Sequence, residues 1–373
     1  MRLTCQRDDL KDAVSMASKP VGNKATQANL RYILLEASDD HLSVSGADLR
    51  MHASVAIEAD VSEPGSVMVL PDRFEDVLNQ CPPSRSVSLT VSGSHRVTVA
   101  CGGVTVRMNG IDPDLFMSVP ILHDAVSFTV PSVTLCELID STAFVARQDD
   151  ARPALAAVSV AVRAGMLTLA TMDGERAAQA TAKIGDGCAD LSILIPGSSL
   201  KMVASSLAKR DAPVTVAYGQ TGSSSRCRIV CGDEAWYLTL IDGTFPDVNR
   251  LAPSKVGMRI VCDRADFLRA MNLARLSDTG TLKAIITPTE GGITMTSTDG
   301  QGDTSCDMQI SARVTGNIGR FALNAKNGKE AADAIDAEQI AIILESPLRP
   351  FVIRAGGPAT GHRHILAPMV IKD

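Results

Sequence analysis

The stretch LTLATMDGERAAQATAKI (residues 167–184) sets the plan of the chain, because two similar stretches occur elsewhere, LSVSGADLRMHASVAI (42–57) and ITMTSTDGQGDTSCDMQI (293–310). In each, small or polar residues alternate with apolar ones, reach an aspartate and then resume, which predicts a half-buried β-hairpin. The turn aspartates, Asp48, Asp173 and Asp299, recur at intervals of 125 and 126 residues in a chain of 373. The sequence therefore predicts one domain repeated three times, each copy with its own core.

The segments that flank the hairpins support this plan. A strand followed by a helix is predicted before each hairpin and again after it, and further short strands close each unit. Each third should therefore hold two helices and antiparallel strands, an α+β organisation. Residues 109–124 and 242–257 share Asp, Pro, Phe and a small hydrophobic tail, and are predicted to connect the units. We place the domains at residues 1–120, 121–250 and 251–373.

Composition agrees with compact domains of ordinary size. A chain of 373 residues with 45% hydrophobic residues has enough apolar material for two or three cores. The amino end, MRLTCQRDDLK, has no apolar signal region and no run approaches the length of a membrane span, so a cytoplasmic protein without a membrane partner is expected. Nine scattered cysteines favour buried thiols in a reducing compartment over a disulfide framework.

Four further stretches carry a resemblance to a known family: FVARQDDARPAL (144–155), TMDGERAA (171–178), DGTFPDVNRLAP (242–253) and HILAPMVI (364–371). Together with the three-unit plan, the chain resembles the β sliding clamps, the beta subunits of bacterial DNA polymerase III, over essentially its whole length. The resemblance implies three similar DNA-clamp domains, each with two helices against antiparallel sheets. It also implies a head-to-tail homodimer that closes a ring around duplex DNA without reading its sequence.

The resemblance further implies a non-catalytic processivity factor with a peptide-binding groove between its second and third domains. The DNA polymerase III catalytic subunit, the clamp loader and other proteins with a clamp-binding motif would insert a short peptide rich in Gln, Leu and Phe. Burying one Leu or Phe contributes about 1.5–3 kcal/mol, so a few anchors give a modest, exchangeable affinity. By position, the groove residues are Leu155, Met172, Gly174, Glu175, Arg176, Ala177, Pro246, Arg250, Leu251, Asn324, Asn327, Leu348, Pro350, Ile365, Leu366, Ala367, Pro368, Met369, Val370 and Ile371.

Five of these positions depart from the commonest residues of the family, which leaves the preferred peptide open. They are Met172, Glu175, Ala177, Asn327 and Ala367.

Cations on the predicted helices and loops are candidates for contacting the phosphate backbone of DNA. Because the net charge of the chain is −6, contacts to DNA phosphates would depend on local clusters of positive charge rather than on the charge of the whole protein. By resemblance, Lys24, Arg73 and Gln148 match family positions near DNA. Each of the other candidates could equally be an ordinary solvated charge. They are Arg7, Lys201, Lys209, Arg210 and Arg264, together with Lys11, Arg147, Arg269 and Lys326.

One departure bears on single-stranded DNA. Pro153 and Ala154 stand where bacterial clamps can place aromatic residues, which puts stacking against a single-stranded template in doubt.

The sequence contains no pattern typical of a nucleotide or metal site, and no cofactor is expected. GQTGSSS (219–225) lacks the lysine of a phosphate-binding loop. Cys227 and Cys231 would lie about 13 Å apart on one strand at roughly 3.3 Å per residue, too far to share a zinc ion, and are predicted to be packed thiols. His362 and His364 lack a nearby third ligand and are predicted to be surface residues.

The acidic residues of the hairpins are better explained by turns than by a cation or a reaction. The series Asp299, Asp303, Asp307 lacks the glycine and glutamate of a calcium loop. The recurrence of the Asp173 position in unlike surroundings favours a turn role over catalysis with Glu175.

Two alternatives remain open beside the clamp. One is a repeated-domain scaffold or peptide-binding protein of the same fold that does not encircle DNA, and a more distant one is a hydrolase with an unrecognised carboxylate site. Oligomeric state and topology separate the first from a clamp, which should be a closed dimer that is retained on circular DNA.

Overall fold

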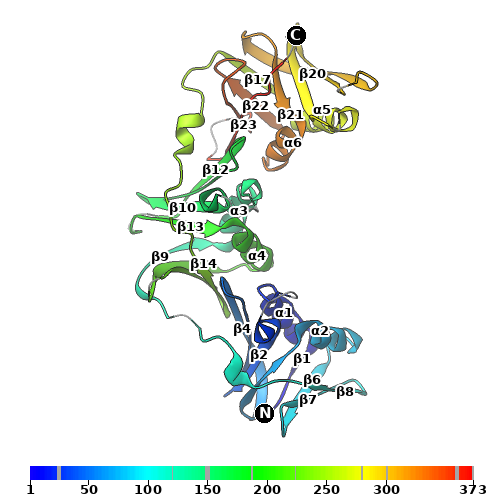
Figure 1. Cartoon of the computed structure of the whole chain (residues 1–373), viewed down its shortest axis with the longest axis vertical. Coiled ribbons are helices and arrows are strands. Elements are labelled where there is room, and N and C mark those ends of the chain that lie inside the picture. Colours follow the sequence, from blue (N-terminus) through cyan, green and yellow to red (C-terminus); the bar gives the residue numbers. More distant parts are fainter. Residues whose placement is uncertain are drawn as a thin grey trace. The chain divides into compact units, whose positions relative to one another are not determined.

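The structure, a computed structural model, describes residues 1–22, 27–119, 121–147, 152–185, 188–222, 224–278, 280–299, 301–357 and 361–371 (Figure 1). The chain forms two compact units, which we call unit 1 (Met1–Leu135 with Met202–Leu240) and unit 2 (Cys136–Lys201 with Ile241–Asp373). Each unit is built on one twelve-stranded sheet whose neighbouring strands run antiparallel.

Unit 1 contains the first third of the chain and part of the central third. In its sheet, the order β8-β7-β6-β1-β4-β16-β15-β14-β9 forms the main path, and β2, β3 and β5 attach beside β4. Its elements are β1 (Arg2–Gln6), α1 (Arg7–Ser18), β2 (Ile33–Ser38), β3 (His41–Ala47), β4 (Met51–Glu63), β5 (Gly65–Val69), α2 (Pro71–Gln80), β6 (Ser86–Ser92), β7 (Arg96–Cys101), β8 (Val104–Asn109), β9 (His123–Pro131), β14 (Pro213–Thr221), β15 (Ser224–Cys231) and β16 (Glu234–Thr239).

Unit 2 contains the rest of the central third and the last third, in the sheet order β13-β10-β11-β12-β24-β23-β22-β17-β20-β19-β18-β21. Its elements are β10 (Ala157–Arg163), β11 (Met166–Met172), β12 (Arg176–Lys183), β13 (Leu191–Pro196), β17 (Met258–Asp263), α5 (Arg264–Ser277), β18 (Lys283–Thr289), β19 (Gly292–Thr298), β20 (Ser305–Gly316), β21 (Phe321–Asn324), α6 (Ala325–Asp333), β22 (Gln339–Leu344), β23 (Phe351–Ala355) and β24 (Arg363–Leu366). Two helices, α3 (Ser132–Asp140) and α4 (Gly197–Leu207), have residues in both units.

The predicted α+β class is confirmed, because each third of the described chain has two α-helices and antiparallel strands. The three predicted hairpins are β3–β4, β11–β12 and β19–β20. The domain boundaries at residues 120 and 250 stay a prediction, since the strands of the central third are shared between the two sheets.

The turn role of the repeated aspartates is confirmed. The backbone N–H of Asp48 donates to the Met51 carbonyl, that of Asp173 to the Arg176 carbonyl, and that of Asp299 to the Thr304 carbonyl. Each aspartate side chain also accepts backbone N–H groups from the residues that follow it. This is the Asx-turn geometry that aspartate favours. It leaves the carboxylates satisfied locally, within the turn.

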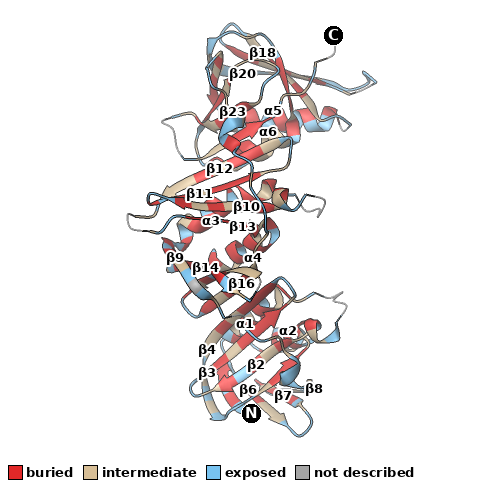
Figure 2. Ribbon diagram, turned by 60° about the vertical axis from the view of Figure 1, so that its left-hand side comes forward, coloured by how far each residue is buried: buried red, intermediate tan, exposed pale blue. Residues whose placement is uncertain are grey.

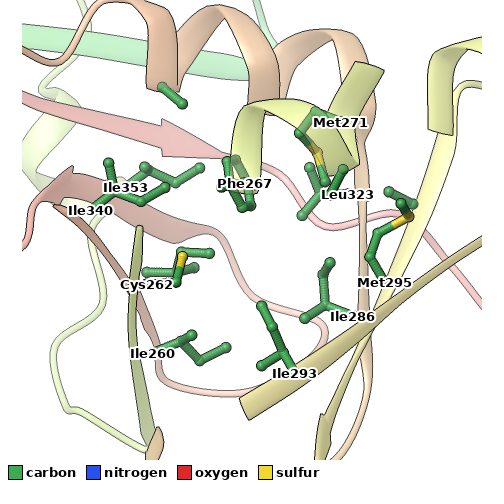
Figure 3. Packing of buried hydrophobic residues seen from close by; sticks show 14 of the residues in the cluster. Ile260, Cys262, Phe267, Met271, Ile286, Ile293, Met295, Leu323, Ile340 and Ile353 are labelled. Carbon is green, nitrogen blue, oxygen red and sulfur yellow. The ribbon is translucent and has the colours of Figure 1, made fainter. Parts of the chain in front are cut away.

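The cores consist mainly of aliphatic side chains, as the low aromatic content requires, with a few buried aromatic rings among them. In the last third, side chains from α5, α6 and the surrounding strands meet in one cluster (Figure 3). Phe267 and Met271 of α5 are fully buried against Ile260 of β17 and Leu323 of β21. Figure 2 shows buried and exposed residues alternating along many strands, which is the period-two pattern that predicted them.

A repeated strand joint connects successive thirds. β4, which follows the turn at Asp48, pairs with β16, the last strand of the central third, so that Met51 lies opposite Leu238. β12, which follows the turn at Asp173, pairs with β24, the last strand of the last third, so that Arg176 lies opposite Leu366. The corresponding strand of the last third is β20, and the last strand of the first third is β8.

Both of those remaining strands have a free edge in the described part of the chain. β8 pairs with β7 alone, and residues 305–308 of β20 pair with β19 alone. Within the described ranges, no helix is long and apolar enough to cross a membrane.

Candidate functional site

A small apolar cluster, separate from the main core of the last third, lies in unit 2 beside the joint between β12 and β24. Its buried members come from five different elements. They are Ala170, Ala177, Val248, Val352 and Ile365. Its partly buried members, which leave apolar surface accessible, are Met172, Phe245, Leu251, Ala252 and Ile343. We call this surface the apolar groove.

The strand joint forms the floor of the apolar groove. Ala177 of β12 and Ile365 of β24 lie directly opposite each other in the ladder, so their side chains point to the same face. Small Ala177 leaves Ile365 accessible to contacts from the segment after residue 241.

The connecting segment is held against the joint by polar contacts. A short 3₁₀ helix, η5 (Val248–Leu251), begins where the Asp247 carboxylate accepts the N–H of Asn249. The Asn249 N–H and side-chain amide hold the pKa of the Asp247 carboxyl below its usual range. Arg363 of β24 donates to the amide oxygens of Gln179 and Asn249. These bonds fix Val248 and Leu251 over the floor.

The segment after β24 is also tied down. The N–H of Ala367 donates to the Glu175 carbonyl at 2.8 Å, and that of Met369 donates to the Ala322 carbonyl at 2.8 Å. Two large apolar side chains of this region remain exposed, Leu348 at 74% and Val370 at 69%. Large exposed apolar side chains of this kind are typical of a protein-binding site when they gather in one patch.

Arg176 precedes Ala177 in β12, but its charge is already paired. Its guanidinium donates to Asp173 at 3.0 Å and to Glu330 of α6, and it lies over the Phe144 ring at 5.5 Å. The Arg176 side chain is only 11% exposed. Arg176 therefore joins the central and last thirds, and has little charge left to offer a ligand.

The structure brings some of the predicted groove residues together and gives others a different place. Met172, Ala177, Leu251 and Ile365 lie in the cluster of the apolar groove. Leu366 belongs to the core of the last third. The Asn324 amide oxygen accepts N–H groups from the first turn of α6, so this side chain caps a helix.

Sequence reasoning missed several members of the apolar groove. Ala170 and Val352 follow from strand alternation, because they share a face with Met172 and with the strand neighbours of Ile365. The connecting segment contributes Phe245, Val248 and Ala252, all within the quoted stretch DGTFPDVNRLAP.

The predicted DNA contacts have mixed placements. Lys24 and Gln148 lie outside the described residues. Arg7 is only 9% exposed, and its guanidinium donates to the Leu78 carbonyl at the end of α2 and to Asp8. Arg264 donates in the same way to the carbonyls of Ala332 and Asp333 at the end of α6. Both arginines complement the carboxyl end of a helix, a placement that argues against a role in holding phosphate.

Other candidate cations lie among acids. Lys209 and Arg210 line a hollow of about 390 Å³ in unit 1 that is also lined by five acidic residues, and Arg210 is paired with one of them, buried Glu234, at 3.4 Å. Arg264 and Lys326 line a hollow of about 970 Å³ in unit 2, again with five acidic residues. Lys201 stands near Glu330, and its partial burial lowers its pKa.

Arg73 has a different environment. It lines a hollow of about 570 Å³ in unit 1 with Arg96 and Arg107, and no acidic residue lines that hollow.

One sequence interpretation is wrong. His364 is 2% exposed rather than on the surface, because β24 is an interior strand between β12 and β23. Its ring packs on Phe144 at 5.7 Å, and burial lowers its pKa to about 3. Cys227 and Cys231 are buried, as predicted for packed thiols. The described residues contain no group of three or more side chains placed to hold a metal ion.

Two family models match the chain. The DNA polymerase III beta subunit N-terminal domain matches residues 1–120, and the central domain of the same subunit matches residues 129–247. Together they cover well over half of the sequence.

Curated relatives and solved structures agree with these models. The chain is 25% identical over 374 residues to the beta sliding clamp of Bacillus subtilis, covering 96% of this chain and 97% of the relative. It is 24% identical to the beta sliding clamp of Streptomyces coelicolor, covering 96% and 95%. The crystal structure of the DNA polymerase sliding clamp from Bacillus subtilis superposes with a TM-score of 0.91 at 22% identity, and that of the beta subunit from Thermotoga maritima with 0.91 at 20%, each covering 100% of both chains.

Proposed function

Because the chain belongs to the family of DNA polymerase III beta subunits, the β sliding clamps, we propose that it closes a dimeric ring around duplex DNA and tethers the replicative polymerase there. In this role it carries out no chemical step. It confers processivity because a ring is retained on DNA by topology, while weak contacts to phosphates leave it free to slide. The observation that carries the proposal is the repeated strand joint with its two free edges.

The free edges support a head-to-tail dimer. Two of the three possible joints, β4 with β16 and β12 with β24, are made within the chain. A second copy can make the third by pairing β20 of one subunit with β8 of the other. A free strand edge readily adds such a strand, and a head-to-tail contact that closes generates a ring.

The internal joints also predict the register of this contact. The backbone carbonyls of Met51, Arg176 and Thr304 each accept the N–H of a turn aspartate, so these three positions correspond. Met51 lies opposite Leu238, and Arg176 lies opposite Leu366. In the last strand of the first third, Met108 corresponds to Leu238 and Leu366. Thr304 of one subunit should therefore lie opposite Met108 of the other. Two positions along, Cys306 should lie opposite Val106.

A single substitution tests the register, because Cys306 is already present. The variant Val106→Cys should form a disulfide with Cys306 of a second copy under mild oxidation, since directly opposite residues in an antiparallel pair lie within disulfide range. A species of twice 39.3 kDa should appear on non-reducing gels. The matched control Thr105→Cys points to the other face and should give no cross-linked species on the same gels.

The cross-linked ring then tests the topology. Loaded onto a nicked circular plasmid first and cross-linked there by oxidation, it should remain bound at high salt and be released when the plasmid is cut once. Retention on the linear DNA, or a protein that is monomeric at all concentrations, would contradict the ring and favour a scaffold of the same fold.

For DNA contacts we propose Lys24, Gln148, Lys201, Lys209 and Arg210, and we leave out Arg7 and Arg264 because their guanidinium groups cap helices. Few such contacts suit sliding better than tight binding, and Lys209 and Arg210 line a hollow where acids outnumber cations. The salt dependence of binding to a short linear duplex should accordingly be shallow.

The apolar groove is the proposed docking site for the polymerase catalytic subunit, the clamp loader and other partners. An apolar surface that buries two or three Leu or Phe side chains gives affinity without permanent attachment. The variant Leu251→Glu should weaken binding of a fluorescent nonapeptide containing Gln-Leu-Leu-Leu-Phe at least tenfold, because it places a charge on the groove wall. The matched control is Leu115→Glu, which charges an apolar residue of the other connection that is 52% exposed. Equal loss in both variants would refute this site.

A further inference from the structure

Two cysteines of the first third lie side by side at the edge of its core. Cys81 directly follows α2, and Cys101 is the last residue of β7. They are 3% and 4% exposed, and their thiol groups are close enough to share a hydrogen bond. Neither is a member of the apolar groove or of a strand joint, so the proposed function leaves this pair without a role.

The backbone on either side of the pair is also in contact. Gly102, which follows Cys101, has a φ of 54°. It approaches Pro82, which follows Cys81, so closely that a Cβ at position 102 would stand 2.9 Å from the proline ring. A disulfide requires two Cα atoms within about 7 Å of each other, and contact between the residues that follow the two cysteines supports such an approach.

The third cysteine in this part of the chain is less well placed to pair with Cys101. Cys5 is on β1, and β6 lies between β1 and β7. Since neighbouring strands are about 4.7–4.9 Å apart, Cys5 lies about 9–10 Å from β7, which is too far for a disulfide. Burial raises the pKa of the Cys5 thiol to about 12, which makes it a poor nucleophile.

The pair is at the margin of the core, close to solvent. Gln80, residues 82–86 and residues 102–103 are all exposed. Each cysteine is therefore one residue away from solvent along the chain, and a small opening of the loop after α2 would admit a molecule as small as hydrogen peroxide. Cys227, by contrast, is fully buried, and burial raises its pKa to about 12.

An arginine lies beside Cys81. The Nε–H of Arg7 and the backbone N–H of Cys81 both donate to the Leu78 carbonyl, at 2.9 and 3.2 Å. Burial raises the pKa of Cys81 and the Cys101 thiol raises it further, whereas the guanidinium of Arg7, which also pairs with Asp8, lowers it. A thiolate at Cys81 would have this cation beside it, so Cys81 is the better nucleophile of the pair.

We propose that Cys81 and Cys101 are a reversible redox pair, which a peroxide converts to an intramolecular disulfide and a small thiol restores. In the first step, the Cys81 thiolate attacks one oxygen of hydrogen peroxide and the O–O bond breaks. Cys81 becomes a sulfenic acid, and the other oxygen leaves as hydroxide, which takes up the proton that the thiol released and becomes water.

The second step closes the disulfide. The Cys101 sulfur attacks the Cys81 sulfur, the S–O bond breaks, and the hydroxyl group leaves with the Cys101 proton as a second water. The two thiols thus lose two electrons, which the peroxide gains. Two molecules of a small thiol reverse the reaction through a mixed disulfide and are themselves oxidised to a disulfide.

The disulfide would change the stability of the first third. It would tie the carboxyl end of α2 to the turn before β8, and it would close a loop that contains all of β6. Because a cross-link restricts the unfolded chain, the oxidised protein should unfold at a higher urea concentration than the reduced protein. The reaction needs neither DNA nor a second copy of the chain, so it is independent of the proposed function.

The test treats the full-length protein with hydrogen peroxide, blocks the remaining thiols with iodoacetamide in urea and digests the chain with trypsin. The two cysteines fall in separate peptides, FEDVLNQCPPSR (74–85) and VTVACGGVTVR (97–107), each with one cysteine. Mass spectrometry should find these peptides joined with the loss of two hydrogen atoms, and dithiothreitol should separate them. The number of thiols in the unfolded chain should fall by two, from nine.

Single variants assign the roles of the two sulfurs. Cys101→Ser should leave Cys81 as a sulfenic acid that dimedone traps, whereas Cys81→Ser should give at least fivefold less adduct at Cys101. The matched control is Cys231→Ser, because Cys231 is also the buried last residue of a strand and precedes a glycine. The cross-link should form in this control as in the wild type. Fluorescence of Trp236, buried in the same unit, reports folding of each variant.

Three results would overturn the proposal. One is a wild-type chain that keeps all nine thiols at a peroxide concentration that oxidises free cysteine. Another is a pair that reacts only after the protein is unfolded in urea, which would make Cys81 and Cys101 inert packed thiols. The third is a cross-link from Cys81 to Cys5, or between two chains, in place of the expected one.

Discussion

The ion pair between Arg176 and Glu330 should hold the central and last thirds together in unit 2. Arg176 is in β12 and Glu330 is in α6, and Asp173 also contacts the guanidinium. Their side chains are 11%, 33% and 21% exposed, respectively. The variant Arg176→Met keeps the apolar stem beside Phe144 but leaves two carboxylates without their cation.

The expected cost lies between two limits. Breaking a fully buried pair costs about 3–5 kcal/mol, whereas an exposed pair contributes about 0–1 kcal/mol. With Glu330 a third exposed, solvent screens part of the interaction, so we expect Arg176→Met to cost about 2 kcal/mol and the coupling with Glu330→Gln to be about 1–2 kcal/mol. Each 1.4 kcal/mol corresponds to a tenfold change in an equilibrium constant.

Hydrogen exchange followed by mass spectrometry provides the readout, because unit 2 contains no tryptophan or tyrosine and fluorescence would not sense it. Peptides that cover β12 and β24 should exchange about 30-fold faster in Arg176→Met, if their exchange follows opening of the joint. The double variant with Glu330→Gln should recover part of this protection.

The exposed pair Arg2 and Glu63, with side chains 57% and 55% exposed at 3.2 Å, serves as the control cycle. Its coupling should be below about 0.5 kcal/mol. A coupling at Arg176 as small as this control would refute the assignment of Arg176 as the residue that joins the two thirds.

Three further changes should alter stability in defined ways. Gly46→Ala should destabilise unit 1 by more than about 3 kcal/mol, because the added Cβ would stand 1.8 Å from the Ala17 carbonyl oxygen; unchanged urea unfolding by Trp236 fluorescence would contradict this. Burial opposes ionisation of Asp278, but hydrogen bonds from the Thr281 hydroxyl and nearby N–H groups hold its pKa at about 2. Its stabilisation of about 2 kcal/mol is present above pH 4 and lost as the pH falls toward 2, so Asp278→Asn should remove it and flatten the acid dependence of unit 2 measured by far-UV circular dichroism. His52 is 4% exposed, neither ring nitrogen has a hydrogen-bond partner among the described residues, and burial lowers its pKa to about 4. Since the unfolded chain takes up a proton at higher pH than the folded one, unit 1 should lose about 3 kcal/mol between pH 6.5 and pH 4, and His52→Leu should lack this slope in Trp236 fluorescence.

Local patterns were sufficient to predict the repeated hairpins and the class of fold. The alternation around Asp48, Asp173 and Asp299 contains both the strand period and the turn residue, so short-range rules apply to it directly. The two helices of each third follow from the same reasoning, because each begins directly after a strand.

Features that depend on long-range pairing were not predictable in this way. His364 looks like a surface residue from its neighbours in sequence, but the pairing of β24 with β12 on one side and β23 on the other buries it. Arg7 looks like an exposed helical cation, yet the carboxyl end of α2 lies within reach of its guanidinium. Strand alternation places Ala170 and Val352 on the right faces of their own strands, but their contact in the apolar groove depends on sheet order, which no local pattern contains.

The strand joint has a consequence for how such a molecule can assemble. Each third presents one joint edge on the strand after its turn aspartate and the complementary edge on its last strand. However many thirds are linked in a row, one edge of each kind is left over at the two ends. An open row would keep adding copies as a filament, and a closed circle is the arrangement that uses every joint edge. Because three thirds are covalently linked, two joints form within each chain when it folds. The third joint has to form between molecules.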